Sequence, residues 1–230
     1  MEHSSTNSFI LASGSPRRSF LLRACRFDFT IEPSHASEDF EPSTPAEEVP
    51  RLLAIRKAEA SRKQHPNSKL IVTADTVVVL KGKILNKPSD ESEAIRMLSE
   101  LSNNTHLVIT AVALSTPNHL EVMECRSLVH FLPLDDQAIK KYVQNFRPLD
   151  KAGAYGAQEC LPDTYNPCSE EETQFLETIG SPNLLEHSKP ERSDHEPLIA
   201  IRKIEGSYFN VMGLPIHLIC KNIHKIIQQN

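Results

Sequence analysis

Asp75 lies between two apolar runs, Leu70–Val72 and Val77–Leu80, which predict buried strand on both sides of the carboxylate. An unpaired charge in such surroundings costs several kcal/mol. Asp75 is therefore either held by strong hydrogen-bond donors or used at a site. At a site it could hold a metal ion or take a proton from water. The alternative is an Asp that caps a turn at the end of a strand.

Basic residues fall at expected strand ends or between regular elements, and they include Arg17, Arg18, Lys57, Lys87 and Lys151. Together with the carboxylates of Glu38 and Asp75, they suit a polyphosphate ester bound with a divalent ion. Arg and Lys neutralise phosphate oxygens. A carboxylate pair binds a hard cation such as Mg²⁺ through oxygen. One carboxylate can also orient or deprotonate the attacking water.

Arg17 and Arg18 follow a short apolar run, Phe9–Ser13, that predicts a first strand. Ser15 suits a helix N-cap and Pro16 suits the first helical position. The two arginines then lie in a first helical turn, where the helix dipole disfavours cations. Beside free backbone N–H groups and serine hydroxyls they could form a phosphate cradle. The alternative is a solvated basic face.

A second helix is expected to begin at the capping box Thr44-Pro45-Ala46-Glu47 and to continue to about Lys63. Lys57 lies late in this helix, where a cation complements the dipole, so a structural role for it stays open. The preceding segment, residues 34–43, is an acidic loop that contains Glu38. Acidic loops are commonly just solvated.

The remaining pattern mixes helices and strands. Helices are expected after Asp90 to about 101, over 135–144 and over 216–227, and strands over 27–31, 105–115, 120–131 and 198–204. The runs 105–115 and 120–131 are most simply an antiparallel pair. The order of elements predicts an α/β protein with a mixed sheet.

Residues 148–158 are rich in small side chains, including two glycines, and could let backbone approach a ligand closely. Residues 160–197 are rich in Pro, Ser, Glu and Asp and show little periodicity, which predicts a mobile insertion. Its Cys and His residues fit no common zinc template; they are Cys160, Cys168, His187 and His195.

Composition narrows the class of protein. The chain has 230 residues, 39% of them hydrophobic and 24% charged, as in a globular protein in solution. Five scattered cysteines fit reduced thiols in a cytoplasm. The net charge of -5 argues against a nucleic-acid partner. We expect no membrane span and no signal peptide.

Several standard catalytic motifs are missing, among them the P-loop, HExxH and GxSxG. The chain instead resembles the Maf family of nucleoside triphosphate pyrophosphatases, historically named for an effect on septum formation. The resemblance rests on five motifs in order: LASGSPRR (11–18), ADTVV (74–78), NKP (86–88), DKAGAYG (150–156) and EGSYFNVMGLP (205–215).

The resemblance implies an ITPase-like α/β fold, with a long mixed sheet, flanking helices and two lobes around a cleft. It implies hydrolysis of a nucleoside triphosphate between the α and β phosphates. Asp75 would be the general base, and Glu38 would help it hold the metal ion, Mg²⁺ or alternatively Mn²⁺ or Co²⁺. The triphosphate site would be lined by Ser13, Ser15, Arg17, Arg18, Lys57, Lys87 and Lys151.

Thr76 and Gln158, with Arg17, would influence selection of the base. The DKAGAYG-x-Q form resembles the subgroup that acts on dTTP and UTP, so we expect these substrates or modified pyrimidine nucleotides. Glu159 takes the usual position of a Gly, and the insertion follows it. Two alternatives are another base preference, such as methylated GTP, and a nucleotide-binding regulator of cell division with little turnover.

The sequence therefore predicts a single Maf-like domain over residues 1–230, with an insertion at about 160–197. The resemblance also suggests a homodimer. Which acidic residue lies beside the metal ion stays open, because Asp39 directly follows Glu38 and could share or replace its role.

Overall fold

The computed structural model describes residues 8–162, 165–188 and 198–229. The chain divides into two compact units. Unit 1 comprises Met1–Asp75, Thr110–Cys125 and Gly213–Asn230, and unit 2 comprises Thr76–Ile109 and Arg126–Met212. His195, and with it part of the expected insertion, lies outside the described residues.

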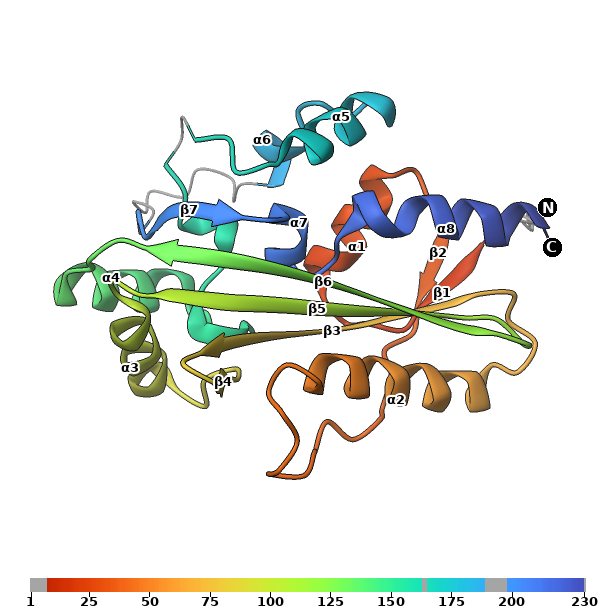
Figure 1. The fold of residues 1–230 in the computed structure, drawn as a ribbon, viewed down its shortest axis with the longest axis horizontal. Coiled ribbons are helices and arrows are strands. Elements are labelled where there is room, and N and C mark those ends of the chain that lie inside the picture. The colour runs from red at the N-terminus through yellow and green to blue at the C-terminus, as the bar shows by residue number, and fades with distance from the viewer. Residues whose placement is uncertain (1–7, 163–164, 189–197, 230) are drawn as a thin grey trace. The chain divides into compact units, whose positions relative to one another are not determined.

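A mixed sheet runs through the fold in the order β2-β1-β3-β5-β6-β7, with β4 paired to β3 (Figure 1). Its strands are β1 (Phe9–Leu11), β2 (Phe29–Ile31), β3 (Ile71–Leu80), β4 (Lys83–Leu85), β5 (Thr105–Ser115), β6 (Leu120–Phe131) and β7 (Ile201–Glu205). β1 is parallel to β2 and β3, whereas β4 is antiparallel to β3 and β7 to β6. The predicted α/β class with a mixed sheet is confirmed.

In unit 1, helices cover the strands on both sides. Figure 1 shows α2 (Val49–Gln64) on one side, and α1 (Pro16–Ala24) and α8 (Ile216–Gln229) on the other. Ala54 and Ala58 of α2 pack against Ala111 and Ala113 of β5. Because alanine side chains are small, the four alanines at this contact let α2 and β5 pack closely together.

The helix expected over 216–227 is α8, and the first half of this helix buries an apolar stripe. Ile216, Ile219, Cys220 and Ile223 are buried. The ring of His224 on the same helix lies 4.6 Å from that of Phe27. The stripe therefore packs on unit 1 itself.

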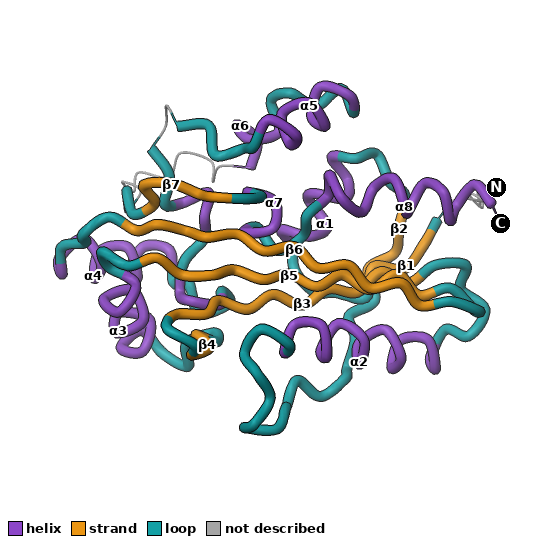
Figure 2. The backbone as a smooth tube through the Cα atoms, in the orientation of Figure 1, coloured by secondary structure: helices purple, strands orange, loops and turns teal. Residues whose placement is uncertain are grey.

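The predicted start of the second helix is wrong. Figure 2 shows a loop between β2 and α2, and α2 begins at Val49, five positions after the expected cap Thr44. Pro50 explains the difference, because it occupies the first or second position of α2. A helix that began at Thr44 would place Pro50 in its interior, where the ring removes a hydrogen bond and clashes with the preceding turn.

Unit 2 also contains α3 (Glu91–Leu101), α4 (Asp136–Phe146) and α7 (Tyr208–Val211). Asp90 caps α3 by accepting a hydrogen bond of 2.8 Å from the N–H of Glu93, as its sequence signature predicts. Asp135 caps α4 in the same way. None of the helices in the described part of the chain is long and apolar enough to cross a membrane.

The sequence pattern of residues 160–197 shows little periodicity and gives no sign of helices. The structure nevertheless contains helices in this segment, which is a correction to the sequence-based interpretation. The segment includes α5 (Glu170–Thr178) and α6 (Leu184–Ser188). Glu172 of α5 is fully buried, and its carboxylate accepts hydrogen bonds from the hydroxyl of Ser207 and from the N–H groups of Tyr208 and Phe209. This carboxylate caps α7, so polar contacts join α5 to α7 within unit 2.

Candidate functional site

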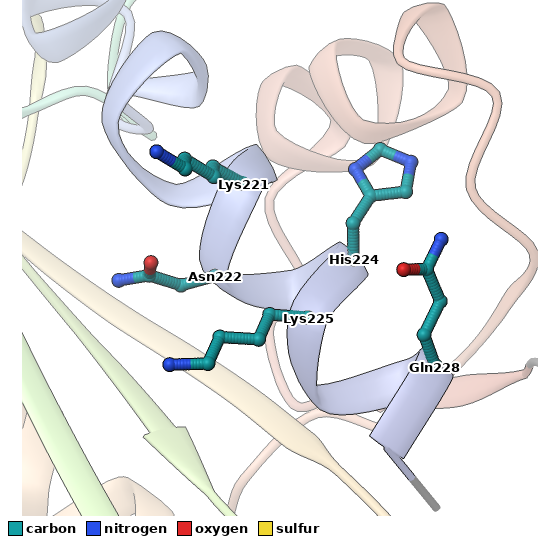
Figure 3. Close-up of a pocket in the computed structure, with 5 residues that line it drawn as sticks. All are labelled: Lys221, Asn222, His224, Lys225 and Gln228. Atoms are coloured by element: carbon teal, nitrogen blue, oxygen red, sulfur yellow. The ribbon is translucent and has the colours of Figure 1, made fainter.

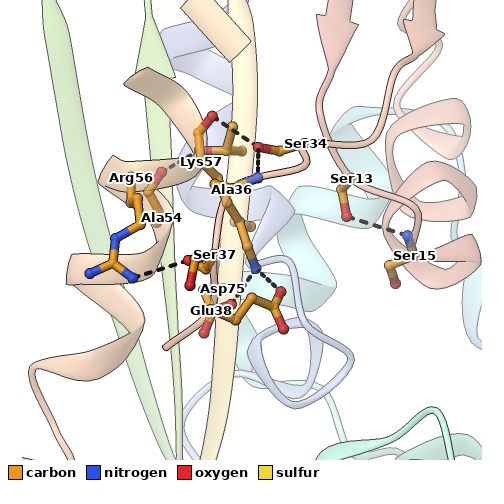
Figure 4. A network of polar contacts seen from close by, with 12 residues as sticks. Ser13, Ser15, Ser34, Ala36, Ser37, Glu38, Ala54, Arg56, Lys57 and Asp75 are labelled. Carbon is orange, nitrogen blue, oxygen red and sulfur yellow. Dashed lines mark hydrogen bonds and ion pairs between the residues drawn. The ribbon is translucent and has the colours of Figure 1, made fainter. Parts of the chain in front are cut away.

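One ammonium group in unit 1 bridges two carboxylates (Figure 4). Lys57 Nζ lies 2.6 Å from Asp75 Oδ1 and 2.6 Å from Glu38 Oε1. The side chains of Lys57 and Asp75 are 12% and 11% exposed, whereas that of Glu38 is 57% exposed. The cluster therefore has one open side, formed by Glu38.

Asp75 lies within β3, so the strand continues through it rather than ending there. Burial raises the pKa of its carboxyl group above the ordinary value of 3.8, while Lys57 and Arg18 oppose this increase. A carboxylate with a raised pKa binds a proton more tightly than an exposed Asp does. Such a group is a stronger base toward a water molecule.

Local contacts hold the elements of this cluster together. Thr73 Oγ1 of β3 donates a hydrogen bond of 2.8 Å to the carbonyl of Ala54, which fastens β3 to α2. Ser34 Oγ donates to the carbonyl of Lys57 at 3.3 Å. Arg56 donates to the carbonyls of Ser37 and Asp39, on either side of Glu38. These bonds position the acidic loop against α2, so Glu38 is held at Lys57.

The neighbouring carboxylate of Asp39 is directed elsewhere. Asp39 Oδ2 accepts a hydrogen bond of 2.8 Å from Ser37 Oγ, and its N–H donates back to the same hydroxyl. Of the two acidic residues left open by the sequence, Glu38 is the one in contact with Lys57.

Arg18 has three acceptors from separate segments of unit 1. Its Nη1 donates to Ser13 Oγ at 3.1 Å and to the carbonyl of Ala74 at 2.7 Å, and its Nε donates to the carbonyl of Gly213 at 2.9 Å. Burial lowers the pKa of Arg18 to about 10, and the carboxylate of Asp75 opposes that decrease. The guanidinium therefore stays charged at neutral pH beside the residue that precedes Asp75.

The other expected residues of the first motif lie around Arg18. Ser13 is buried and Ser15 is the N-cap of α1, with the N–H of Ser15 donating to Ser13 Oγ at 3.3 Å. Arg17 is half-buried in the first turn of α1. The structure thus groups Ser13, Ser15 and Arg18 directly, as the phosphate-cradle interpretation requires.

Four expected site residues belong to unit 2, namely Thr76, Lys87, Lys151 and Gln158. Thr76 is half-buried on β3, and Lys87 is exposed on the segment after β4. Lys151 is nearly buried, with Nζ 2.8 Å from Asp150 Oδ1 and 3.6 Å from Glu159 Oε1.

Gln158 has an orphaned polar atom. Its Oε1 is buried, and no hydrogen-bond partner for it occurs among the residues that the structure describes. A buried amide oxygen without a donor is uncommon, because it forfeits its hydration. The atom therefore has the capacity to accept a hydrogen bond from a ligand.

Comparison with known proteins decides the family. A family model described as Maf-like protein matches residues 8–163. The chain belongs to the Maf family. Among its relatives, a "dTTP/UTP pyrophosphatase" of Porphyromonas gingivalis is 39% identical over 96% of this chain and 95% of its own length. One of the same name from Christiangramia forsetii is 34% identical over 95% of this chain and 93% of its own.

A solved structure gives a weaker likeness. The Ham1 protein of Staphylococcus aureus aligns with 54% of this chain, and 71% of its own, at a TM-score of 0.38 and 19% identity. The assignment to the Maf family does not depend on this partial overlap.

Two residues of this Maf protein gain importance only from the structure. Tyr142 of α4 donates a hydrogen bond of 2.5 Å to Glu159 Oε2 and accepts one of 3.0 Å from the N–H of Gly156. The sequence places Tyr142 in the helix expected over 135–144 and Glu159 at a departure from the family pattern, but neither observation links them. The link holds the turn that carries Gln158.

A pocket of about 590 Å³ in unit 1 lies apart from these residues of the Maf motifs (Figure 3). It is lined by residues of α8, namely Lys221, Asn222, His224, Lys225 and Gln228. Asn222 already donates to Glu121 at 2.9 Å, and the ring of His224 contacts the carbonyl of Cys220 at 2.9 Å. Since none of the expected site residues lines it, the pocket is not the candidate site.

Proposed function

We propose that this Maf family protein hydrolyses dTTP and UTP to the nucleoside monophosphate and pyrophosphate. The observation that carries the proposal is the Asp75–Lys57–Glu38 cluster, open on the side of Glu38, in a chain whose relatives bear the name dTTP/UTP pyrophosphatase at 33–39% identity. Modified pyrimidine nucleotides are further candidate substrates.

Asp75 is the proposed general base. Its burial raises the pKa of the carboxyl group, which strengthens it as an acceptor for the proton of the attacking water. The water attacks the α-phosphorus, and pyrophosphate leaves with the oxygen that bridges the α and β phosphates. The charge that develops on the leaving group is stabilised by the cations of the site.

The proposed triphosphate-binding residues are Ser13, Ser15, Arg17, Arg18, Lys57, Lys87 and Lys151. The three acceptors of Arg18 support its part, because they hold a charged guanidinium in one orientation. Preorganised cations cost no rearrangement when charge develops. Lys87 is exposed, so it is free to bind phosphate without loss of packing.

The carboxylates fit a divalent metal ion. Glu38 and Asp75 present hard oxygen ligands that converge on one point, the ammonium of Lys57. We propose that these two residues hold the ion, with Mg²⁺ as the natural choice and Mn²⁺ or Co²⁺ as substitutes. When bound, it would supply positive charge to the phosphate oxygens and lower the pKa of a bound water.

Base selection is assigned to Gln158 and Thr76, together with Arg17. Thymine and uracil carry an N–H donor at N3 between two carbonyl oxygens, whereas cytosine carries an acceptor at N3. The buried Gln158 Oε1, which has no donor among the described residues, supports a role as acceptor for this N3–H. Methylated GTP or another base stays an alternative, as does a nucleotide-binding regulator with little turnover.

We also propose where the protein is located and how it assembles. All five cysteines are free thiols, which supports a cytoplasmic location. The homodimer and the single domain over residues 1–230, with its insertion at about 160–197, stay predictions. A nucleic-acid or membrane partner is not part of the proposal.

The test is pyrophosphate release by the purified protein with Mg²⁺, across dTTP, UTP, CTP, ATP, GTP and a methylated GTP. We expect rapid turnover of dTTP and UTP, and a loss of about 10²–10⁴-fold in kcat for Asp75→Asn. Turnover of a purine alone would discard the pyrimidine assignment. Unchanged turnover in Asp75→Asn would remove Asp75 as the base, and binding without turnover would favour the regulator.

A further inference from the structure

We infer that Lys57 is an internal competitor of the divalent cation: its ammonium occupies the position between Glu38 and Asp75, and it must leave when the metal ion binds there. This inference rests on the proposed function, because it concerns the same pair of carboxylates. It assigns Lys57 a movement and a role in the order of binding, beyond neutralising phosphate.

The geometry supports occupation of a cation position. Lys57 Nζ is equally close to both carboxylates, at 2.6 Å from one oxygen of each. Glu38 and Asp75 come from different segments, a loop and a strand, and the ammonium of Lys57 lies between them. A metal ion that takes an oxygen from each residue would need the same space.

Electrostatics forbids the two cations from sharing that space. The two positive charges of the metal ion and the one of Lys57 would face the two negative charges of Glu38 and Asp75, and the guanidinium of Arg18 adds further positive charge nearby. Like charges within a few ångströms of each other repel strongly in a partly buried site. The ammonium of Lys57 therefore moves away when the metal ion binds. The affinity for the metal ion is reduced by the free energy needed to displace the ammonium.

Lys57 is able to move, whereas the neighbouring cation is not. A lysine carries its charge on a flexible four-carbon stem. Its backbone belongs to α2, whereas its ammonium lies at the far end of this stem, and Glu38 leaves one side of the cluster open. Arg18 is fixed by acceptors on three segments. The site thus combines a fixed cation with a movable one.

A displaced ammonium needs a new anionic partner, and the phosphates of a bound nucleotide provide it. The metal ion and the nucleotide should consequently favour each other's binding, because the phosphates replace Glu38 and Asp75 as the anionic partners of Lys57. A bare metal ion gains no such compensation. Weak binding of the metal ion alone is therefore a property built into unit 1.

The experiment measures Mn²⁺ binding to the full chain without nucleotide, from the electron paramagnetic resonance signal of free Mn²⁺. We expect Kd for Lys57→Met to fall about tenfold below the wild-type value, because the competing charge is gone. Lys57→Arg keeps the charge and should bind no more tightly than wild type. Lys63→Met removes an exposed charge from the same helix and serves as the matched control.

A second substitution ties the effect to this pair of carboxylates. Adding Glu38→Gln to Lys57→Met should abolish the gain in Mn²⁺ affinity. Equal or weaker Mn²⁺ binding by folded Lys57→Met would overturn the inference, and so would the absence of binding in every variant. That result would leave Lys57 as a fixed ion-pair partner of Asp75.

A measurement on wild-type protein guards against a variant that does not fold. With ¹³C-labelled lysine, the ε-methylene signal of Lys57, assigned by its loss in Lys57→Arg, should shift on addition of Mg²⁺, while that of Lys63 stays in place. A signal of Lys57 that is unmoved at saturating Mg²⁺ would contradict displacement. Absence of pyrophosphate release by the wild-type protein, alongside tighter Mn²⁺ binding in Lys57→Met, would instead refute only the proposed function.

Discussion

The guanidinium of Arg18 donates a hydrogen bond of 2.9 Å to the carbonyl of Gly213, 195 positions later in the chain. The same side chain bonds to Ser13 and to the carbonyl of Ala74. One residue of the first motif thus joins the end of β1, the middle of β3 and the loop before α8. The first and last motifs of the sequence meet at this contact.

Replacing Arg18 by Lys should destabilise the protein by about 1–3 kcal/mol, although the charge is kept. A compact ammonium cannot reach three acceptors on three segments, so at least one carbonyl loses its donor. Urea denaturation of Arg18→Lys measures the loss, with Arg23→Lys at the exposed end of α1 as control. Equal stability of the two variants would show that charge alone matters at Arg18.

The raised pKa of Asp75 should appear in the pH dependence of stability when EDTA keeps divalent ions away. Above the ordinary value of 3.8, the unfolded chain loses this proton first, while the folded protein still holds it. Protons then favour the folded state, and stability falls as pH rises from 3.8 through the pKa of folded Asp75. Asp75→Asn should lack this decrease.

Unfolding free energies of wild type and Asp75→Asn, measured across the acidic range in EDTA, check this expectation. The unfolding free energy of the wild type should fall relative to that of Asp75→Asn as the pH increases. A change in the opposite direction would mean that Lys57 outweighs burial and holds the pKa below its ordinary value.

The two neighbouring acidic residues should respond differently to neutralisation. Glu38→Gln removes a carboxylate that contacts Lys57, whereas Asp39→Asn alters one that accepts a bond from Ser37. We expect kcat/KM for dTTP to fall by about tenfold or more in Glu38→Gln, the loss of roughly 1.4 kcal/mol or more in transition-state binding. Asp39→Asn should stay close to wild type, and the reverse order would transfer the role to Asp39.

The buried carboxylate of Glu172 should matter for stability. Glu172→Ala leaves the donors of Ser207, Tyr208 and Phe209 without their acceptor inside the protein, at a cost of about 2–5 kcal/mol. Glu171→Ala, exposed on the same helix, is the matched control. Thermal unfolding of both variants measures the difference. A minor effect in Glu172→Ala would show that the contact between α5 and α7 contributes little to stability.

Much of the fold could be predicted because its signals are local. The strands over 105–115 and 120–131 have the predicted bounds, since apolar runs and the turn between them lie within one stretch of sequence. The start of α2 was missed because Thr44 offers a strong local cap, while Pro50 imposes a stronger limit five residues into such a helix.

The candidate site was predictable by residue type and less so by contact. The cost of burying a charge singles out Asp75 from sequence alone. Its partner Lys57 lies 18 positions earlier, and only the packing of α2 on the sheet brings the two together. The same holds for Glu172, whose acceptor role depends on residues 35–37 positions later.

The turn that carries Gln158 has an evolutionary consequence. A Cβ atom at Gly156 would lie 2.8 Å from the carboxylate of Glu159, which Tyr142 holds in place at 2.5 Å. A side chain at 156 would push the Glu159 carboxylate aside, so the hydrogen bond between Tyr142 and Glu159 depends on the absence of a side chain at 156. Positions 142, 156 and 159 should therefore co-vary among Maf family sequences, as a single inherited unit rather than three independent sites.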